Sequence, residues 1–264
     1  MGNRHGEPVW YELMCRDLSV TEPFYAAVVG WNFVDTGMDN APGYRFIRHG
    51  AGDYDAMGGA LALTDEMLAG GARPMWAVYF AVEDVDATVA AITARGGSVL
   101  MPAFDLEHVG RMAFVADPQG NPFYVMRGFS DMESRVFGET GEDTGLCGWN
   151  ELITPDVEPT LGFYRDILRF DTEERMPMGP ELGDYVFLKT GESMIGAAMM
   201  KTPDSPAGWR FYFRIADIEA GKAAVEANGG TVVFGPMEVP GDEMIIIALD
   251  PEGTIFGLVA PKKD

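Results

Sequence analysis

The chain has 264 residues, of which 47% are hydrophobic and 11% aromatic, enough apolar side chain for packed cores in one large or two ordinary domains. Its 41 acidic and 19 basic residues give a formal net charge of -22. A surface that is negative over most of its area repels phosphate backbones and anionic lipids, so we expect neither nucleic acid nor membrane as a partner.

The cysteines and the start of the chain indicate where the protein resides. Cys15 and Cys147 are too few for a disulfide framework, and neither lies in a CxxC motif or a Cys/His cluster. The first residues, MGNRHGEPVW, lack the apolar run of a signal peptide, and no apolar stretch has the length needed to cross a bilayer. We therefore expect a cytoplasmic protein.

In chain order, the first half alternates predicted strands and helices. A strand containing WYELM leads into the helix SVTEPFYAAVVG, and three short apolar strands follow: WNFVD, YRFIRHG and MGGALAL. FAVED then leads into the helix VDATVAAITARGG, which Gly96 and Gly97 are expected to close, and three more strands follow: SVLM, RMAFVAD and FYVM. DPQG at Asp117 predicts a tight turn before the last strand. Each series reads β-α-β-β-β.

The second half repeats this series. ELMCRDLSVTEPFYAAVVGWNF from Glu12 matches ELITPDVEPTLGFYRDILRFD from Glu151, an offset of 139 residues. YFAVEDVDATVAAITARGGSV from Tyr79 matches YFRIADIEAGKAAVEANGGTV from Tyr212, and ADPQGNPFYVM matches LDPEGTIFGLV, both at an offset of 133. The chain is thus a tandem duplication. We place a first domain at 1–129, an acidic, Gly-containing linker at 130–144, and a second domain at 145–264.

Three recurring motifs carry a resemblance to a known family: FY followed by GW or RF at the helix end, F-x-V-x-D before the second helix, and the DPxG turn. In this order, over nearly the whole chain, they resemble the vicinal oxygen chelate superfamily, which includes glyoxalase I, bleomycin-resistance proteins, fosfomycin-resistance enzymes and extradiol dioxygenases. The resemblance implies an α+β fold of four βαβββ modules in two tandem domains of the glyoxalase/bleomycin-resistance type. Each domain would be a curved mixed sheet that forms a cup with its helices outside.

The metal-dependent members of this family line the cup with His and Glu ligands and leave an open coordination position. By resemblance, the ligand positions fall in this chain on Trp10, Trp149, Ala77, Arg210, Tyr124 and Gly257. The chain has only three histidines, and no two of them are spaced as metal ligands. We therefore expect no cofactor and no metal ligands, with an atypical divalent metal as the open alternative.

A different set of residues is predicted to line each cup. Alternation along a strand places Trp10, Glu12 and Met14 on one face, which the resemblance makes the cup face. The same parity adds residues from the other modules: Trp149, Glu151, Tyr79, Tyr124, Tyr212, Arg210 and Arg214. Each cup would then combine a tryptophan wall with one Glu and one Tyr hydroxyl. An apolar pocket with a few convergent polar groups is the usual anatomy of a small-molecule site.

Glu12 and Glu151 admit three interpretations. A carboxylate among aromatic side chains loses hydration, which raises its pKa and suits it to general acid–base catalysis, with Tyr79 or Tyr212 orienting the substrate or donating a proton. Alternatively, each Glu is structural and hydrogen-bonds a Tyr or a backbone amide, or it binds a cationic or hydroxylated ligand without turnover. In the second repeat, Arg210 is expected either to pair with Glu151 or to receive an anionic group. The first cup is better suited to a neutral or cationic ligand.

The sequence therefore favours a small-molecule-binding protein of the glyoxalase/bleomycin-resistance type, with the usual metal ligands missing and an apolar or aromatic ligand. The alternative is an enzyme of this superfamily, a lyase, isomerase or hydroxylase/dioxygenase-like protein, that uses Glu/Tyr acid–base chemistry or an atypical divalent metal. Whether catalysis occurs stays open. Because the two halves already supply the pairing that smaller relatives obtain by dimerisation, we expect a monomer or a weak homodimer.

Overall fold

The structure is a computed structural model that describes residues 2–37, 43–52, 55–203 and 205–263. The elements of the first half are β1 (Pro8–Cys15), α1 (Leu18–Val28), β2 (Asn32–Asp35), β3 (Tyr44–Arg48), β4 (Ala56–Ala62), α2 (Asp65–Ala69), β5 (Met75–Ala81), α3 (Val85–Ala94), β6 (Ser98–Leu106), β7 (Gly110–Ala116) and β8 (Pro122–Gly128). Those of the second half are β9 (Cys147–Thr154), α4 (Val157–Leu168), β10 (Arg175–Pro177), β11 (Asp184–Thr190), β12 (Ser193–Met200), β13 (Gly208–Arg214), α5 (Ile218–Ala227), β14 (Thr231–Val239), β15 (Glu243–Leu249) and β16 (Ile255–Pro261).

The predicted α+β fold of repeated βαβββ modules is confirmed. The strands form two eight-stranded sheets, in the orders β2-β3-β4-β1-β5-β8-β7-β6 and β10-β11-β12-β9-β13-β16-β15-β14. Both sheets are mixed, because β1 pairs with β4 in parallel while β3 pairs with β4 in antiparallel, and β9, β12 and β11 repeat this arrangement. The same strand order in both sheets is the structural form of the sequence duplication.

The helix boundaries follow from local chemistry. Asp17, Asp84 and Asp217 are the N-cap residues of α1, α3 and α5, and their carboxylates accept hydrogen bonds from backbone N–H groups of the first turn. Gly96 and Gly229 follow α3 and α5 with φ of +85° and +87°, as predicted for glycines that close a helix. The sequence pattern did not predict α2, a single turn of five residues capped by Thr64. No helix in the described ranges has the length and apolar character that a membrane crossing requires.

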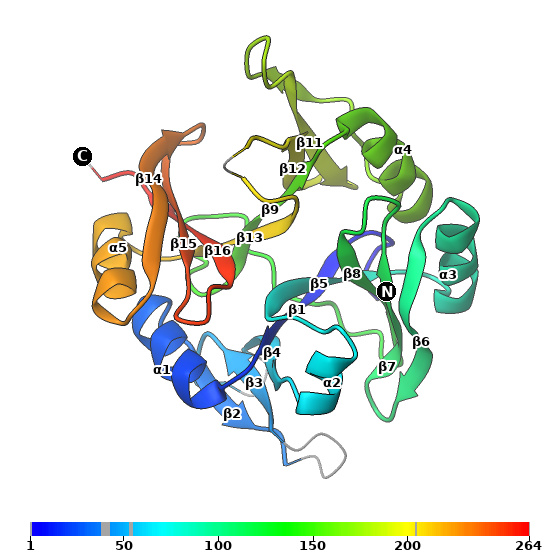
Figure 1. Cartoon of the computed structure of the whole chain (residues 1–264), viewed down its shortest axis with the longest axis horizontal. Coiled ribbons are helices and arrows are strands. Elements are labelled where there is room, and N and C mark those ends of the chain that lie inside the picture. The colour runs from blue at the N-terminus through cyan, green and yellow to red at the C-terminus, as the bar shows by residue number, and fades with distance from the viewer. Residues whose placement is uncertain (1, 38–42, 53–54, 204, 264) are drawn as a thin grey trace. The chain divides into compact units, whose positions relative to one another are not determined.

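Contacts between residues divide the chain into two compact units, and each unit contains modules from both repeats. Unit 1 consists of Met1–Val9, Ala77–Ser134 and Trp149–Arg210, and unit 2 of Trp10–Trp76, Arg135–Gly148 and Phe211–Asp264. In unit 2, α1 contacts α5, and in unit 1, α3 contacts α4 (Figure 1). The inner two modules therefore belong to one unit and the outer two to the other. The domain boundaries predicted at residues 129 and 145 stay a prediction.

Much of the predicted linker is an integral part of unit 2. Its Gly138 N–H donates to the Cys147 carbonyl at 2.9 Å, and its Val136 carbonyl accepts from the Cys147 N–H at 3.1 Å. Directly after the predicted linker, the Trp31 indole N–H donates to the carbonyl oxygen of Gly145 at 2.7 Å. Phe137 also forms an isolated β-bridge with Cys147. The segment after Ser134 is thus fixed by hydrogen bonds rather than acting as a loose spacer.

A buried hydrogen-bond network joins the two modules of each unit. In unit 2, the Tyr25 hydroxyl accepts from the Trp76 indole at 2.9 Å and donates to the Asp250 carboxylate at 3.2 Å. In unit 1, Tyr164 accepts from Trp209 at 3.1 Å and donates to Asp117 at 3.2 Å. The tyrosines belong to the FY motifs and the aspartates to the DPxG turns. The recurring motifs of the sequence are therefore in contact across modules.

The network requires both tyrosine hydroxyls to carry their protons. Burial raises the pKa of Tyr25 and of Tyr164 well above the usual phenol value, so both hydroxyls keep their protons and act as donors at neutral pH. Each aspartate also accepts two backbone N–H bonds within its own turn, Asp250 from Glu252 and Thr254, and Asp117 from Gln119 and Asn121. The network thus fixes the conformation of the turn as well as the contact between modules.

We predict that Tyr25→Phe and Tyr164→Phe each lower the free energy of unfolding by about 1–3 kcal/mol, because each leaves a buried indole N–H without its acceptor and removes a hydrogen bond to a buried carboxylate. Urea denaturation at pH 7 measures the change. Phe129, which is 59% exposed, provides the control variant Phe129→Leu, expected to change stability by less than about 0.5 kcal/mol. Unfolding midpoints of both tyrosine variants equal to that of the unmodified protein would contradict the role of the network.

Candidate functional site

The first candidate cluster lies in unit 2 and joins β1 to β3. The Trp10 indole N–H donates to the Tyr44 hydroxyl at 3.0 Å, and this hydroxyl donates to the Glu12 carboxylate at 3.1 Å. Phe46, two residues after Tyr44, packs edge-on against Trp10 with a centroid distance of 6.0 Å. Because Trp10 and Glu12 contact the same tyrosine, the prediction that they share one face of their strand is confirmed.

The second repeat builds the same cluster in unit 1. The Trp149 indole donates to the Tyr185 hydroxyl at 2.8 Å, and Tyr185 donates to the Glu151 carboxylate at 2.9 Å. Phe187 packs edge-on against Trp149 at 6.2 Å. The two clusters, Trp10–Tyr44–Glu12 and Trp149–Tyr185–Glu151, are called the Trp–Tyr–Glu clusters below.

Burial differs within each cluster. Glu12 is 4% exposed and Glu151 is 6% exposed, whereas Trp10, Tyr44, Trp149 and Tyr185 are all half-buried. Each tyrosine hydroxyl accepts from an indole and donates to a carboxylate, so the chain of hydrogen bonds has one direction and orients both rings. The result is a half-buried tryptophan and tyrosine that are hydrogen-bonded in series to a buried carboxylate.

Arg210 makes the second cluster different from the first. Its guanidinium contacts the Glu151 carboxylate at 3.2 Å and donates to the Ser205 hydroxyl at 2.9 Å. The arginine and glutamate side chains are 5% and 8% exposed, so this is a buried ion pair. The internal pairing of Arg210 with Glu151, one of the two alternatives left open by the sequence, is therefore present. The corresponding residue of the first repeat, 133 positions earlier, is Ala77.

The remaining aromatic residues of the predicted cups pack against residues of the neighbouring strand in the sheet. Tyr79 of β5 is in register with Tyr124 of β8, and their rings stack at 4.0 Å with an interplanar angle of 4°. Phe114 stacks on the other face of Tyr124 at 4.3 Å. In the second repeat, Tyr212 of β13 is in register with Gly257 of β16. A Cβ atom at Gly257 would clash with the Tyr212 ring, so the glycine leaves the space that the ring occupies.

The last two residues predicted to bind ligand are Met14 and Arg214. Met14 is buried, with 5% of its surface exposed. The Arg214 guanidinium donates to the Gly138 carbonyl at 2.9 Å and forms an ion pair with Glu243. These contacts connect Arg214 to the segment between the repeats and to β15, which is a structural role within unit 2.

Sequence reasoning missed Tyr44 and Tyr185, the central residues of the two clusters. A signal for them exists, since YRFI at 44–47 and YVFL at 185–188 both place a Tyr two residues before a Phe at the start of the third strand. Neither tyrosine is near Trp10 or Trp149 in sequence, and their contact depends on strand pairing.

The residues at the inherited ligand positions do not fit a divalent metal. The indole nitrogens of Trp10 and Trp149 carry hydrogens that they donate to tyrosines, so they offer no lone pair to a metal. Arg210 places a positive charge directly on Glu151, which opposes a cation there. Among the described residues, no group of three or more His, Cys, Asp or Glu is arranged as metal ligands.

Comparison with known proteins identifies the family. A family model described as Glyoxalase/Bleomycin resistance protein/Dioxygenase superfamily matches residues 8–125 and 147–258. The chain belongs to the glyoxalase/bleomycin resistance protein/dioxygenase superfamily. It is 33% identical over 259 residues to the Mycobacterium tuberculosis protein named "Putative glyoxylase CFP32", covering 98% of this chain and 96% of that protein. It is also 28% identical to "Anthracycline biosynthesis protein DauV" of Streptomyces sp. (strain C5), covering 96% and 93%.

Solved structures of the superfamily share the fold. The Mn(II)-bound glyoxalase from Novosphingobium aromaticivorans superposes with a TM-score of 0.67 at 17% identity, covering 98% of this chain and 83% of that one. The 2,2',3-trihydroxybiphenyl 1,2-dioxygenase from Sphingomonas wittichii strain RW1 gives a TM-score of 0.66 at 17% identity, covering 97% and 91%. At such identities the likeness establishes the superfamily fold and not the activity.

We predict a strong energetic coupling between Arg210 and Glu151. In a double-mutant cycle of Arg210→Met and Glu151→Gln, the coupling should be about 1–3 kcal/mol, because either single change leaves a buried partner unpaired. Arg169 and Glu83 provide a matched pair, bidentate at 2.8 and 2.9 Å but 58% and 67% exposed, for which the coupling should stay below about 1 kcal/mol. Urea denaturation of the seven proteins gives both values, and equal couplings would show that burial of the Arg210 pair is unimportant.

Proposed function

We propose that this protein binds a small, largely apolar or aromatic molecule at its Trp–Tyr–Glu clusters. The observation that carries the proposal is the repeated hydrogen-bonded series of a half-buried tryptophan, a half-buried tyrosine and a buried glutamate. Large aromatic faces with few, directed polar groups are typical of small-molecule sites. Retention of the arrangement in both repeats, while neighbouring positions differ, supports a role for the cluster itself.

The chemistry of the cluster favours particular ligands. The faces of an indole and a phenol contact flat apolar rings, and the buried carboxylate is a hydrogen-bond acceptor for a hydroxyl or amino group. Anionic ligands are disfavoured directly beside this buried carboxylate, because like charges repel at short distance. The proposed ligand of the first cluster is therefore a neutral or cationic aromatic molecule with a hydrogen-bond donor.

The name of one relative supports this ligand class. One of them is named for anthracycline biosynthesis, and anthracyclines contain several fused rings, part of them aromatic and hydroxylated. A hydroxylated polycyclic compound presents both features that the cluster would recognise, a flat ring face and a hydroxyl donor.

Catalysis is the second candidate. It is favoured by the hydrogen bond from Tyr44 to Glu12, because a phenol and a carboxylate in contact can hold and transfer a proton at a substrate oxygen. The name glyoxylase of a 33% identical relative points the same way. Mass spectrometry of an identified ligand after incubation separates the two, since a binding protein returns the compound unchanged. A changed product whose formation is lost in Glu12→Gln would favour the enzyme.

We predict that the uncharged probe 1,4-dihydroxyanthraquinone quenches tryptophan fluorescence on binding, and that Trp10→Phe or Trp149→Phe weakens the binding by at least about fivefold. A tryptophan at the centre of a binding site typically contributes more than about 1 kcal/mol. Tyr44→Phe and Tyr185→Phe should weaken binding less than the tryptophan changes, because they keep the ring and remove only the hydroxyl. Isothermal titration calorimetry of each variant gives the dissociation constants.

Phe129→Leu, an exposed aromatic position, serves as the control and should leave the affinity unchanged. If neither tryptophan variant alters the affinity for the probe, the Trp–Tyr–Glu clusters are not the binding site. Circular dichroism of each variant establishes that it is folded before its affinity is compared.

A further inference from the structure

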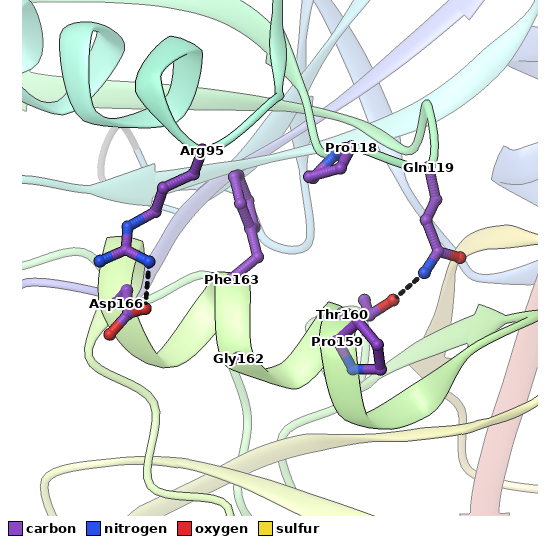
Figure 2. Close-up of a pocket in the computed structure, with 8 residues that line it drawn as sticks. All are labelled: Arg95, Pro118, Gln119, Pro159, Thr160, Gly162, Phe163 and Asp166. Atoms are coloured by element: carbon purple, nitrogen blue, oxygen red, sulfur yellow. Dashed lines mark hydrogen bonds and ion pairs between the residues drawn. The ribbon is translucent and has the colours of Figure 1, made fainter.

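Unit 1 contains a half-open cavity of about 420 Å³ that lies apart from the Trp–Tyr–Glu cluster residues. Its floor and walls come from the turn after β7 and from α4, with the last turn of α3 at one end. Figure 2 shows the apolar side chains of Pro118 and Phe163 in the middle of the cavity. A volume of this size is within the range of small-molecule sites.

The two ends of the cavity are polar and differ in charge. At one end, Arg95 forms an ion pair of 2.5 Å with Asp166, and both side chains are exposed, by 50% and 47% (Figure 2). At the other end, the Gln119 amide donates to Thr160 and to the backbone carbonyl of Asp156. The cavity thus has an exposed ion pair at one end, an apolar middle, and a neutral hydrogen-bonded wall at the other end.

The charged end is specific to this unit. The residues of the other repeat that correspond to Arg95 and Asp166 are Asn228 and Ala27, at offsets of 133 and 139 residues. Gln119 corresponds to Glu252, whose carboxylate instead accepts two backbone N–H bonds of 2.7 Å from Arg16 and Asp17. The corresponding positions therefore differ at both ends of the cavity: unit 1 has the Arg95–Asp166 ion pair at one end and the neutral Gln119 at the other.

We propose that this cavity is a second binding site, for a small aromatic carboxylate with one or two rings. The ring would lie against the exposed Pro118 and Pro159, which supply most of the apolar contact surface, while Phe163 is 5% exposed and adds a small part of it. The carboxylate would bind Arg95, because a guanidinium presents five N–H donors in a planar fork that matches a carboxylate. Asp166 competes for the same guanidinium, and an exposed ion pair of this kind is weak enough to be shared or displaced.

Removing the charge of Asp166 and removing the charge of Arg95 should change the affinity for the ligand in opposite directions. With 2-naphthoate as the probe, Asp166→Asn should strengthen binding about two- to fivefold, since it removes the competing carboxylate. Arg95→Gln should weaken binding by at least about tenfold, which is the loss of a charge-assisted hydrogen bond. The neutral analogue 2-naphthamide should bind the unmodified protein as weakly as 2-naphthoate binds Arg95→Gln. Isothermal titration calorimetry of the full chain at pH 7 measures all four affinities.

Arg169→Gln is the matched control, because Arg169 is a comparably exposed arginine of α4's C-terminal cap, paired with Glu83 outside this cavity. The Arg169→Gln variant should have the same affinity for 2-naphthoate as the unmodified protein. The variants Trp10→Phe and Trp149→Phe should also keep this affinity. Equal affinity in the unmodified protein and Arg95→Gln, or no gain in Asp166→Asn, overturns the proposal. Loss of binding in the tryptophan variants would also overturn it, by assigning the probe to the Trp–Tyr–Glu clusters.

Discussion

The hydrogen bond from a buried tyrosine to a buried aspartate holds each compact unit together. Tyr25 and Asp250 belong to modules at opposite ends of the sequence, and Tyr164 and Asp117 belong to the two inner modules. A phenol and a carboxylate removed from water lose stability unless they are hydrogen-bonded, and here each module supplies a partner for the buried polar group of the other. This constraint explains why the FY and DPxG motifs occur together in every repeat.

The same constraint positions the candidate sites. The tyrosine at the helix end fixes α1 and α4 against the sheets, and the strands that precede these helices, β1 and β9, carry Trp10, Glu12 and their counterparts. The aspartate turn also positions the side chain two residues after the aspartate, whose backbone N–H it accepts. In unit 1 that side chain is Gln119 at the wall of the cavity, and in unit 2 it is Glu252, which caps backbone amides. One scaffold thus supports two local environments.

Much of the fold could be predicted because its signals are local. Alternation within WYELM placed Trp10 and Glu12 on one face, and aspartates and glycines marked helix ends, since parity and capping depend on neighbours in sequence. The tyrosines that contact these residues could not be assigned, because Tyr44 reaches Glu12 only through the pairing of β3, β4 and β1. The sequence also contained no indication that each compact unit contains modules from both repeats. That arrangement depends on contacts such as the one between Tyr25 and Asp250, which are 225 residues apart.

Duplication allows the two clusters to keep one geometry while the residues around them differ. In the second repeat, Arg210 pairs with Glu151 and also donates to the Ser205 hydroxyl, so β13 and the segment before it contribute to that cluster. In the first repeat, alanine stands at the position that matches Arg210, so β5 contributes no charged side chain there. The Tyr–Glu hydrogen bond is present in both repeats with either neighbour, at 3.1 Å from Tyr44 to Glu12 and 2.9 Å from Tyr185 to Glu151. The geometry of the clusters therefore depends on the pairing of the first, third and fourth strands of each repeat, and the arginine is an addition of the second repeat.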